Sequence, residues 1–176
     1  PKWGTGWKKA IRDSYLHNMS IGVSSSVMPY KQCYLDLDPT YKDGYGLPLL
    51  RMTFDWQQNE LRMTQFMAGK TENIVKAIGP DAYDMGFKSL SAHYDVRPYQ
   101  STHTTGGAIM GDSPATSVVN KYLQCWDVSN VFVAGASCFP QNHAYNPTGI
   151  VGATTLFSAN AIKTIYLKNP GPMVQA

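Results

Sequence analysis

Ser101-Thr-His-Thr-Thr-Gly-Gly-Ala-Ile-Met-Gly111 is one of two motif-rich stretches that decide how this chain is interpreted. The other is Gly135-Ala-Ser-Cys-Phe-Pro-Gln-Asn-His-Ala-Tyr-Asn-Pro-Thr-Gly149. The first stretch places an imidazole, which titrates near neutral pH, beside a Gly-Gly pair that permits a tight turn. The second ends in Asn-Pro-Thr-Gly, which is typical of a helix start. The free N–H groups and positive dipole end of such a helix favour negative charge.

Five short motifs follow one another in these stretches and in the segment between them. In chain order they are His103 with Gly106-Gly107, Met110-Gly111, Asn130-Val-Phe-Val-Ala-Gly-Ala-Ser137, Phe139-Pro140 and Asn146-Pro147-Thr148. This order resembles the C-terminal half of the glucose-methanol-choline (GMC) oxidoreductases, over roughly residues 90–168. Two further motifs are most similar to one bacterial branch of the family: Trp126-Asp-Val128 and the ending Asn169-Pro-Gly-Pro-Met-Val-Gln-Ala176. That branch comprises the flavoprotein subunits of gluconate 2-dehydrogenase and of FAD-dependent glucose, sorbitol and fructose dehydrogenases.

The resemblance implies an FAD-dependent dehydrogenase that oxidises the CH-OH group of a sugar, sugar acid or polyol. It assigns catalysis to His103 and Asn146, and FAD contacts to Ala136, Asn146, Pro147 and Thr148. His143 and Tyr145, in the same loop as Asn146, are candidate substrate contacts. No metal site is expected.

The chemistry of these side chains agrees with that assignment. Alcohol oxidation removes a proton from oxygen while a hydride leaves carbon, and an imidazole is suited to take that proton near neutral pH. A carboxamide can donate or accept a hydrogen bond but cannot act as the base, so His103 is the expected base and Asn146 its partner. Plainer alternatives are a structural histidine at 103, a turn residue before proline at 146 and a loop residue at 143.

A complete enzyme of this type would also carry G-x-G-x-x-G after an early strand, where the backbone approaches the FAD pyrophosphate. The chain has no such spacing. We therefore expect residues 1–176 to be the C-terminal substrate-binding and catalytic region of a larger flavoenzyme, with FAD bound mainly by an N-terminal part. The branch resemblance implies cytochrome c and small subunits as partners and a periplasmic or membrane-associated location through them. A non-catalytic carbohydrate-binding module sharing the fold remains the alternative.

Composition narrows the function classes. The chain has 176 residues, is 43% hydrophobic and carries a net charge of +3, which suits one domain with a real core. Basic residues form no block, so nucleic-acid binding is not expected. The three cysteines lack C-x-x-C spacing and are expected to be buried small hydrophobes. Arg51 and Arg97 could bind an anionic substrate, and a sugar-stacking surface could come from aromatic residues such as Trp56, Tyr94, Tyr99 and Tyr145.

Periodicity predicts an α+β fold, with an antiparallel substrate-binding sheet backed by helices, plus a strand and a helix that complete an FAD-binding domain. Strands are expected within 24–54, followed by a helix from Trp56 to Ile78 with Asp55 as its N-cap and Gly79-Pro80 as its stop. A buried strand is expected at Val131–Ala134. The last helix is expected from about Gly152 to Leu167, with an apolar face of Leu156, Ala159, Ile162 and Ile165.

Overall fold

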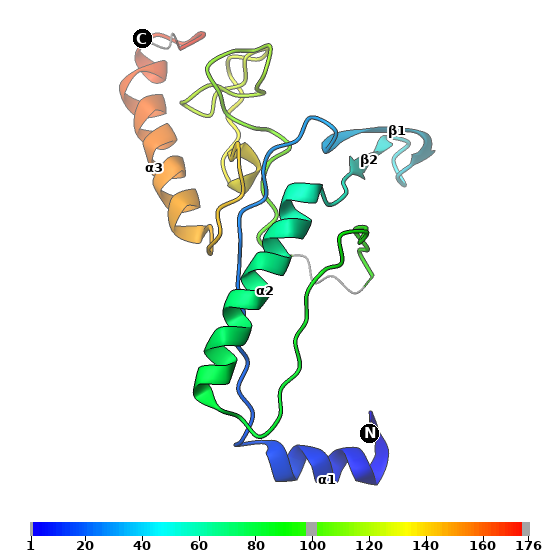
Figure 1. The fold of residues 1–176 in the computed structure, drawn as a ribbon. Coiled ribbons are helices and arrows are strands. Elements are labelled where there is room, and N and C mark those ends of the chain that lie inside the picture. The colour runs from blue at the N-terminus through cyan, green and yellow to red at the C-terminus, as the bar shows by residue number, and fades with distance from the viewer. Residues whose placement is uncertain (1, 98–101, 174–176) are drawn as a thin grey trace.

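The computed structural model describes residues 2–97 and 102–173 and contains three α-helices and one two-stranded sheet within those ranges. In Figure 1 the long helix α2 (Gln58–Ile78) runs through the middle, with helix α1 (Gly4–Ser14) below one end. The hairpin of β1 (Tyr34–Lys42) and β2 (Pro48–Thr53) projects near the other end. Helix α3 (Thr148–Thr164) lies beside a compact group of loops. The fold is therefore α+β, as the sequence predicts.

The hairpin confirms the antiparallel strands expected within 24–54. Leu35 pairs with Met52 and Leu37 with Leu50, and the Asp43 carboxylate accepts the turn N–H groups of Tyr45 and Leu47 at 2.8 and 2.9 Å. Every residue of β2 is nevertheless exposed. The expectation of a sheet backed by helices is therefore wrong for the described residues, because α2 begins directly after β2 and runs away from it (Figure 1).

Helix α2 ends where the sequence predicts. Gly79 adopts the left-handed conformation, with φ of 70°, and its N–H donates to the carbonyl of Val75. The predicted N-cap is wrong, because the cap position falls on Gln57. The Asp55 carboxylate instead accepts the N–H groups of Trp56 and Tyr94, both at 2.8 Å, and pairs with His93. A tertiary contact thus takes the oxygens that a cap would have used.

Two extended segments accompany α2 along its length (Figure 1). On one side the Glu60 carboxylate accepts the Met28 N–H at 3.2 Å and the Tyr30 hydroxyl at 3.0 Å. On the other, the Gln58 side chain donates to the Leu90 carbonyl at 2.9 Å. We call residues 2–97 the open region, because only Glu60, Leu61 and Thr71 are buried within it. Helix α1, which the periodicity did not predict, has no buried residue.

The better packed part, here called the packed region, comprises residues 105–139 with Ser158, Ala161 and residues 171–173. Its core is formed by Val119, Leu123 and Cys138, which are all at most 1% exposed. Two buried amides link this core to the C-terminal stretch. The Asn120 amide donates to the Met173 carbonyl, and the Gln124 side chain donates to the carbonyls of Ser129 and Gly171 and accepts the Met173 N–H at 2.8 Å. Satisfied buried amides of this kind specify one arrangement of the turns they join.

Two expectations about this region are wrong. Residues 131–134 do not form a buried strand: Val131 is 43% exposed, and the segment contributes only an isolated bridge between Phe132 and Gln124. Helix α3 begins at Thr148, and it buries Ser158 and Ala161 instead of the apolar face with Leu156, which is 73% exposed. The Ser158 hydroxyl donates to the Tyr122 carbonyl at 2.7 Å, so a small polar residue brings α3 close to the loop at Tyr122.

The chain exposes far more surface than a self-contained domain of its mass. Its accessible surface is 13191 Å², whereas the scaling for compact monomers gives roughly 8,500 Å² at this mass. Large apolar side chains such as Trp3, Tyr45 and Leu156 contribute to that surface, at 85, 94 and 73% exposure. The core is therefore smaller than the composition predicts, and the chain's own contacts cover only part of its apolar surface.

Candidate active site

The two motif-rich stretches lie side by side. Three hydrogen bonds join them in register: Gly106 N–H to Ala136 carbonyl at 3.1 Å, Ala108 to Ser137 at 3.0 Å and Met110 to Cys138 at 2.8 Å. The Cys138 side chain is fully buried beneath this ladder, and burial raises the pKa of its thiol. The packed region therefore holds the His103 stretch against the segment that leads to Asn146.

The backbone around His103 is held in an uncommon conformation. His103 has φ of 61°, a region that non-glycine residues seldom occupy. The Asn142 amide donates to the His103 carbonyl at 2.8 Å, which ties this turn to the second stretch. Gly106 and Gly107 follow with φ of 85° and 97°. A β-carbon at Gly107 would lie 2.6 Å from the Leu35 side chain. The absence of a side chain at Gly107 therefore lets Leu35 of the β1–β2 hairpin pack closely against the glycine turn.

His103, His143 and Tyr145 line one cavity of about 370 Å³. Other lining residues come from the open region and include Trp56 and Lys88. The His143 ring packs edge-on against Phe139, with 5.5 Å between centroids. Three side chains predicted to be functional are thus gathered where the open region meets the segments that flank the packed region.

Trp56 is fixed by its neighbours at the cavity wall. It packs edge-on against Phe54 at 5.3 Å and Tyr94 at 5.8 Å, and the Lys88 ammonium lies 4.8 Å from its ring centroid. Behind it the Asp55 carboxylate contacts the His93 ring at 2.6 Å, and this hydrogen bond lowers the pKa of Asp55. Trp56 and Tyr94 therefore serve mainly in packing, and Tyr99 lies outside the described residues.

Glu60 also lines this cavity and is 3% exposed. One carboxylate oxygen accepts Met28 N–H and the Tyr30 hydroxyl, whose pKa is raised by burial and by this hydrogen bond. The other oxygen, Oε2, is buried and has no hydrogen-bond partner among the described residues. Glu60 thus anchors the segment around Met28 to α2.

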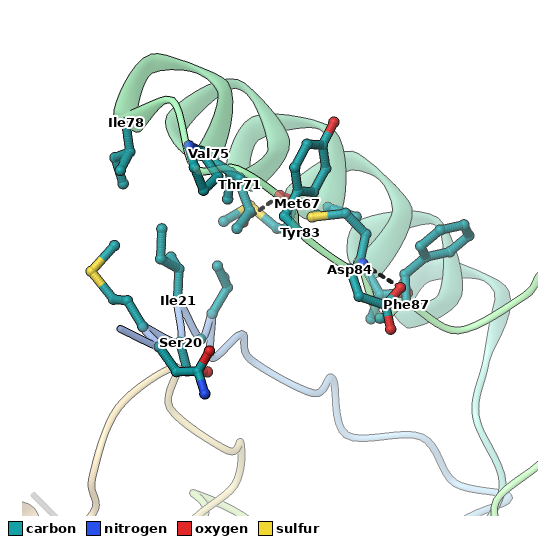
Figure 2. A pocket seen from close by; sticks show the side chains of 18 of the residues that line it. Ser20, Ile21, Met67, Thr71, Val75, Ile78, Tyr83, Asp84 and Phe87 are labelled. Atoms are coloured by element: carbon teal, nitrogen blue, oxygen red, sulfur yellow. Dashed lines mark hydrogen bonds between the residues drawn. The ribbon is translucent and has the colours of Figure 1, made fainter. Parts of the chain in front are cut away.

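A larger cavity of about 1040 Å³ follows α2 away from the histidines. Figure 2 shows Met67, Val75 and Ile78 of α2 facing Ile21 across it, with Tyr83 and Phe87 along one side. It meets the smaller cavity at Thr64 and Lys88, which line both. None of the sequence-predicted site residues lines it, so its size alone does not make it the active site.

The predicted FAD contacts gather around the start of α3. Pro147 occupies the N-cap position and Thr148 the first helical position, and the first helical hydrogen bond runs from Val151 N–H to the Pro147 carbonyl. The preceding N–H groups point out of the helix, as at any helix start. Asn146 is exposed and does not line the histidine cavity. The predicted pairing of His103 with Asn146 remains a prediction.

The arginines suggested for an anionic substrate have other partners. Arg51 pairs across the hairpin with Asp36, and its Nε donates at 2.8 Å. Arg97 pairs with Asp95 at 2.6 Å. In both cases the hydrogen bond lowers the pKa of the aspartate.

No helix among the described residues has the length and apolar character needed to cross a membrane. In the same part of the chain, no group of three or more histidine, cysteine or acidic side chains is arranged to hold a metal ion.

Comparison with known proteins agrees with the resemblance drawn from the motifs. The family model described as GMC oxidoreductase matches residues 29–155. The chain is 56% identical over 176 residues to the gluconate 2-dehydrogenase flavoprotein of Pantoea cypripedii. The match covers 100% of this chain and 29% of that protein. It is 30% identical over 154 residues to the fructose dehydrogenase large subunit of Gluconobacter japonicus, covering 86% and 26% respectively.

A third relative, the 2-methyl-1,2-propanediol dehydrogenase of Mycolicibacterium austroafricanum, is 27% identical over 161 residues, or 91% of this chain and 28% of that protein. The chain therefore belongs to the GMC oxidoreductase family and corresponds to its C-terminal part. It spans less than a third of the length of these relatives.

Sequence reasoning missed three side chains at the cavity. Asn142 lies within the quoted second stretch, but its bond to the His103 carbonyl depends on a turn that no local pattern specifies. Glu60 and Lys88 lie outside both motif-rich stretches and belong to no motif. Only tertiary packing brings them to the histidines.

Proposed function

We propose that this chain is the C-terminal catalytic portion of an FAD-dependent dehydrogenase that oxidises the CH-OH group of a sugar, sugar acid or polyol. The observation that carries the proposal is the shared cavity of His103 and His143, built on the paired stretches of a GMC oxidoreductase. A non-catalytic carbohydrate-binding module is the alternative, and flavin reduction by a sugar distinguishes the two.

The residues around the start of α3 are compatible with FAD. A β-carbon added at Gly135 or Gly149 would meet no atom within 4 Å, so both flanks of the Ala136 to Thr148 segment leave open space. The N–H groups at Thr148 and Gly149 and the helix dipole favour the negative charge of a reduced flavin. Ala136, Asn146, Pro147 and Thr148 would contact the isoalloxazine and ribityl end, and helix α3 with the segment that precedes it would complete an FAD-binding domain.

In the proposed reaction His103 takes the proton from the substrate hydroxyl, and the carbon becomes a carbonyl. FAD, when bound, accepts the hydride that leaves this carbon. Asn146 would hydrogen-bond the substrate oxygen, and His143 and Tyr145 would hold the rest of the substrate. Asn142 positions His103 through its carbonyl. The term large subunit in one relative's name supports further subunits in general. By the resemblance to the bacterial branch we propose that these include small subunits and a cytochrome c, and that the enzyme is periplasmic or membrane-associated through them.

The test is anaerobic stopped-flow mixing of the full-length flavoprotein with gluconate, glucose, sorbitol and fructose. We expect bleaching of the flavin absorbance with at least one of them, and its loss in His103→Ala with FAD still bound. A protein that binds a sugar without flavin reduction would instead support the carbohydrate-binding module.

A further inference from the structure

The histidine cavity contains one lysine whose partner is an aromatic ring rather than a carboxylate. Lys88 and Glu60 are the charged side chains among its lining residues, apart from the titratable histidines. The Lys88 ammonium lies 4.8 Å from the Trp56 centroid, and no carboxylate of the described residues is within ion-pair distance of it. A ring face attracts an ammonium but accepts none of its directed hydrogen bonds fully, so its N–H donors remain available.

The acid in the same wall does not compete strongly for that lysine. Glu60 is 3% exposed, and its Oε1 already accepts the Met28 N–H and the Tyr30 hydroxyl. Its Oε2 is buried beneath the wall. The charge presented to the cavity space is therefore that of Lys88, on the wall formed by the open region.

We propose that Lys88, held over Trp56, binds the carboxylate of a sugar-acid substrate and makes the enzyme prefer aldonic acids to neutral polyols. This proposal rests on the proposed function, since it names the substrate class of that site. The remaining lining residues offer hydroxyl and amide groups suited to a polyol chain: Ser24, Ser25, Thr102, Asn142 and Tyr145. A cavity of about 370 Å³ is within the usual range for a small-molecule site.

An anchored carboxylate would also select the oxidised carbon. In an aldonic acid the hydroxyl of carbon 2 is adjacent to the carboxylate, so fixing the carboxylate limits which hydroxyl reaches His103. The relative with 56% identity is named for gluconate and for position 2. Arg51 and Arg97 are less suited to this role, because Asp36 and Asp95 already neutralise them.

The experiment compares gluconate with gluconamide, which has the same carbon chain and hydroxyls but no charge. Binding is measured by calorimetry on full-length flavoprotein in the His103→Ala background, where substrate is not consumed. We expect Lys88→Met to weaken gluconate binding at least tenfold and gluconamide binding less than twofold. Lys88→Arg should retain most of the gluconate affinity, and added salt should reduce it.

Lys70→Met is the matched control, because Lys70 also lies over an aromatic ring, Phe66 at 5.2 Å, but lines neither cavity. Equal losses for the two ligands, or an unchanged gluconate affinity in Lys88→Met, would overturn the Lys88 proposal. Flavin reduction by neutral polyols in the active enzyme, with no preference for gluconate, would overturn it while leaving the proposed function intact. Failure of every sugar and sugar acid to reduce the flavin would instead reject the proposed function, while calorimetry would still test Lys88.

Discussion

The packed and open regions differ in where their polar groups find partners. In the packed region Asn120 and Gln124 are 2% and 1% exposed and are bonded to the turn and to the C-terminal stretch. In the open region the strands of the hairpin are almost wholly exposed, and the buried Glu60 has an oxygen without a partner among the described residues. The histidine cavity is lined by residues of the open region and by residues 102–103 and 142–145, which flank the packed region.

This difference suggests a division of roles. The packed region pairs the stretch that follows His103 with residues 136–138, and Asn142 donates to the His103 carbonyl, while the open region contributes Trp56 and Lys88 to the lining of the cavity. Substitutions in the packed region should therefore change stability, whereas those at the cavity should change kinetics or binding. The predictions below test that separation in the full-length flavoprotein.

The largest effect is expected for His103→Ala. Removal of the general base should slow flavin reduction at least ~100-fold, the low end for such a group, while FAD stays bound and the unfolding midpoint stays close to that of the unchanged protein. Asn146→Ala should cost on the order of 1 to 3 kcal/mol in the same step, because it removes a hydrogen bond only. Stopped-flow reduction measures both, and a larger defect in Asn146→Ala would reverse the assignment.

Gln124→Met should have the opposite signature. It keeps the side-chain length but leaves the Met173 N–H and the carbonyls of Ser129 and Gly171 without their partner. Unsatisfied buried groups should lower stability by about 3 kcal/mol, seen as a lower denaturant midpoint at an unchanged slope. Flavin reduction per folded molecule should be unchanged. Gln58→Met is the control, since Gln58 is exposed and makes one hydrogen bond to the Leu90 carbonyl.

Gly107→Ala acts at the contact between the two regions and should affect both properties. The new methyl group would lie 2.6 Å from the Leu35 side chain, and φ of 97° is unfavourable for alanine. We expect a loss of about 1 to 3 kcal/mol in stability and slower flavin reduction through a displaced His103. Adding Leu35→Ala should recover the steric part only. Full recovery would mean that the backbone conformation contributes nothing.

The sequence predicted the parts of this molecule whose signals are local. The Gly79 stop of α2 and the hairpin each follow from neighbouring residues, and both are observed. The Asn-Pro-Thr-Gly motif likewise marks the observed helix start at Thr148, although periodicity placed that start near Gly152. The errors are at Asp55, at residues 131–134 and on the outer face of α3. There, tertiary hydrogen bonds redirect Asp55, and the small Ser158 rather than Leu156 makes the close contact. For the same reason, motifs identified His103 and His143 but not Lys88.

The smallest effect is expected for His143→Gln. Its ring lines the cavity and packs against Phe139, but no hydrogen bond of His143 to another site residue is seen in the described structure. If it only holds substrate, glutamine should weaken substrate affinity severalfold and leave the maximal rate of flavin reduction nearly unchanged, the pattern of lost uniform binding. Flavin reduction rates at saturating and at limiting gluconate distinguish a change in the maximal rate from a change in substrate affinity. If His143 were a second base, the pH profile of reduction would lose one ionisation near neutrality. A reduction rate that collapses in His143→Gln while His103→Gln stays active would move the base to the second stretch, and the cavity would have to be reassigned around it.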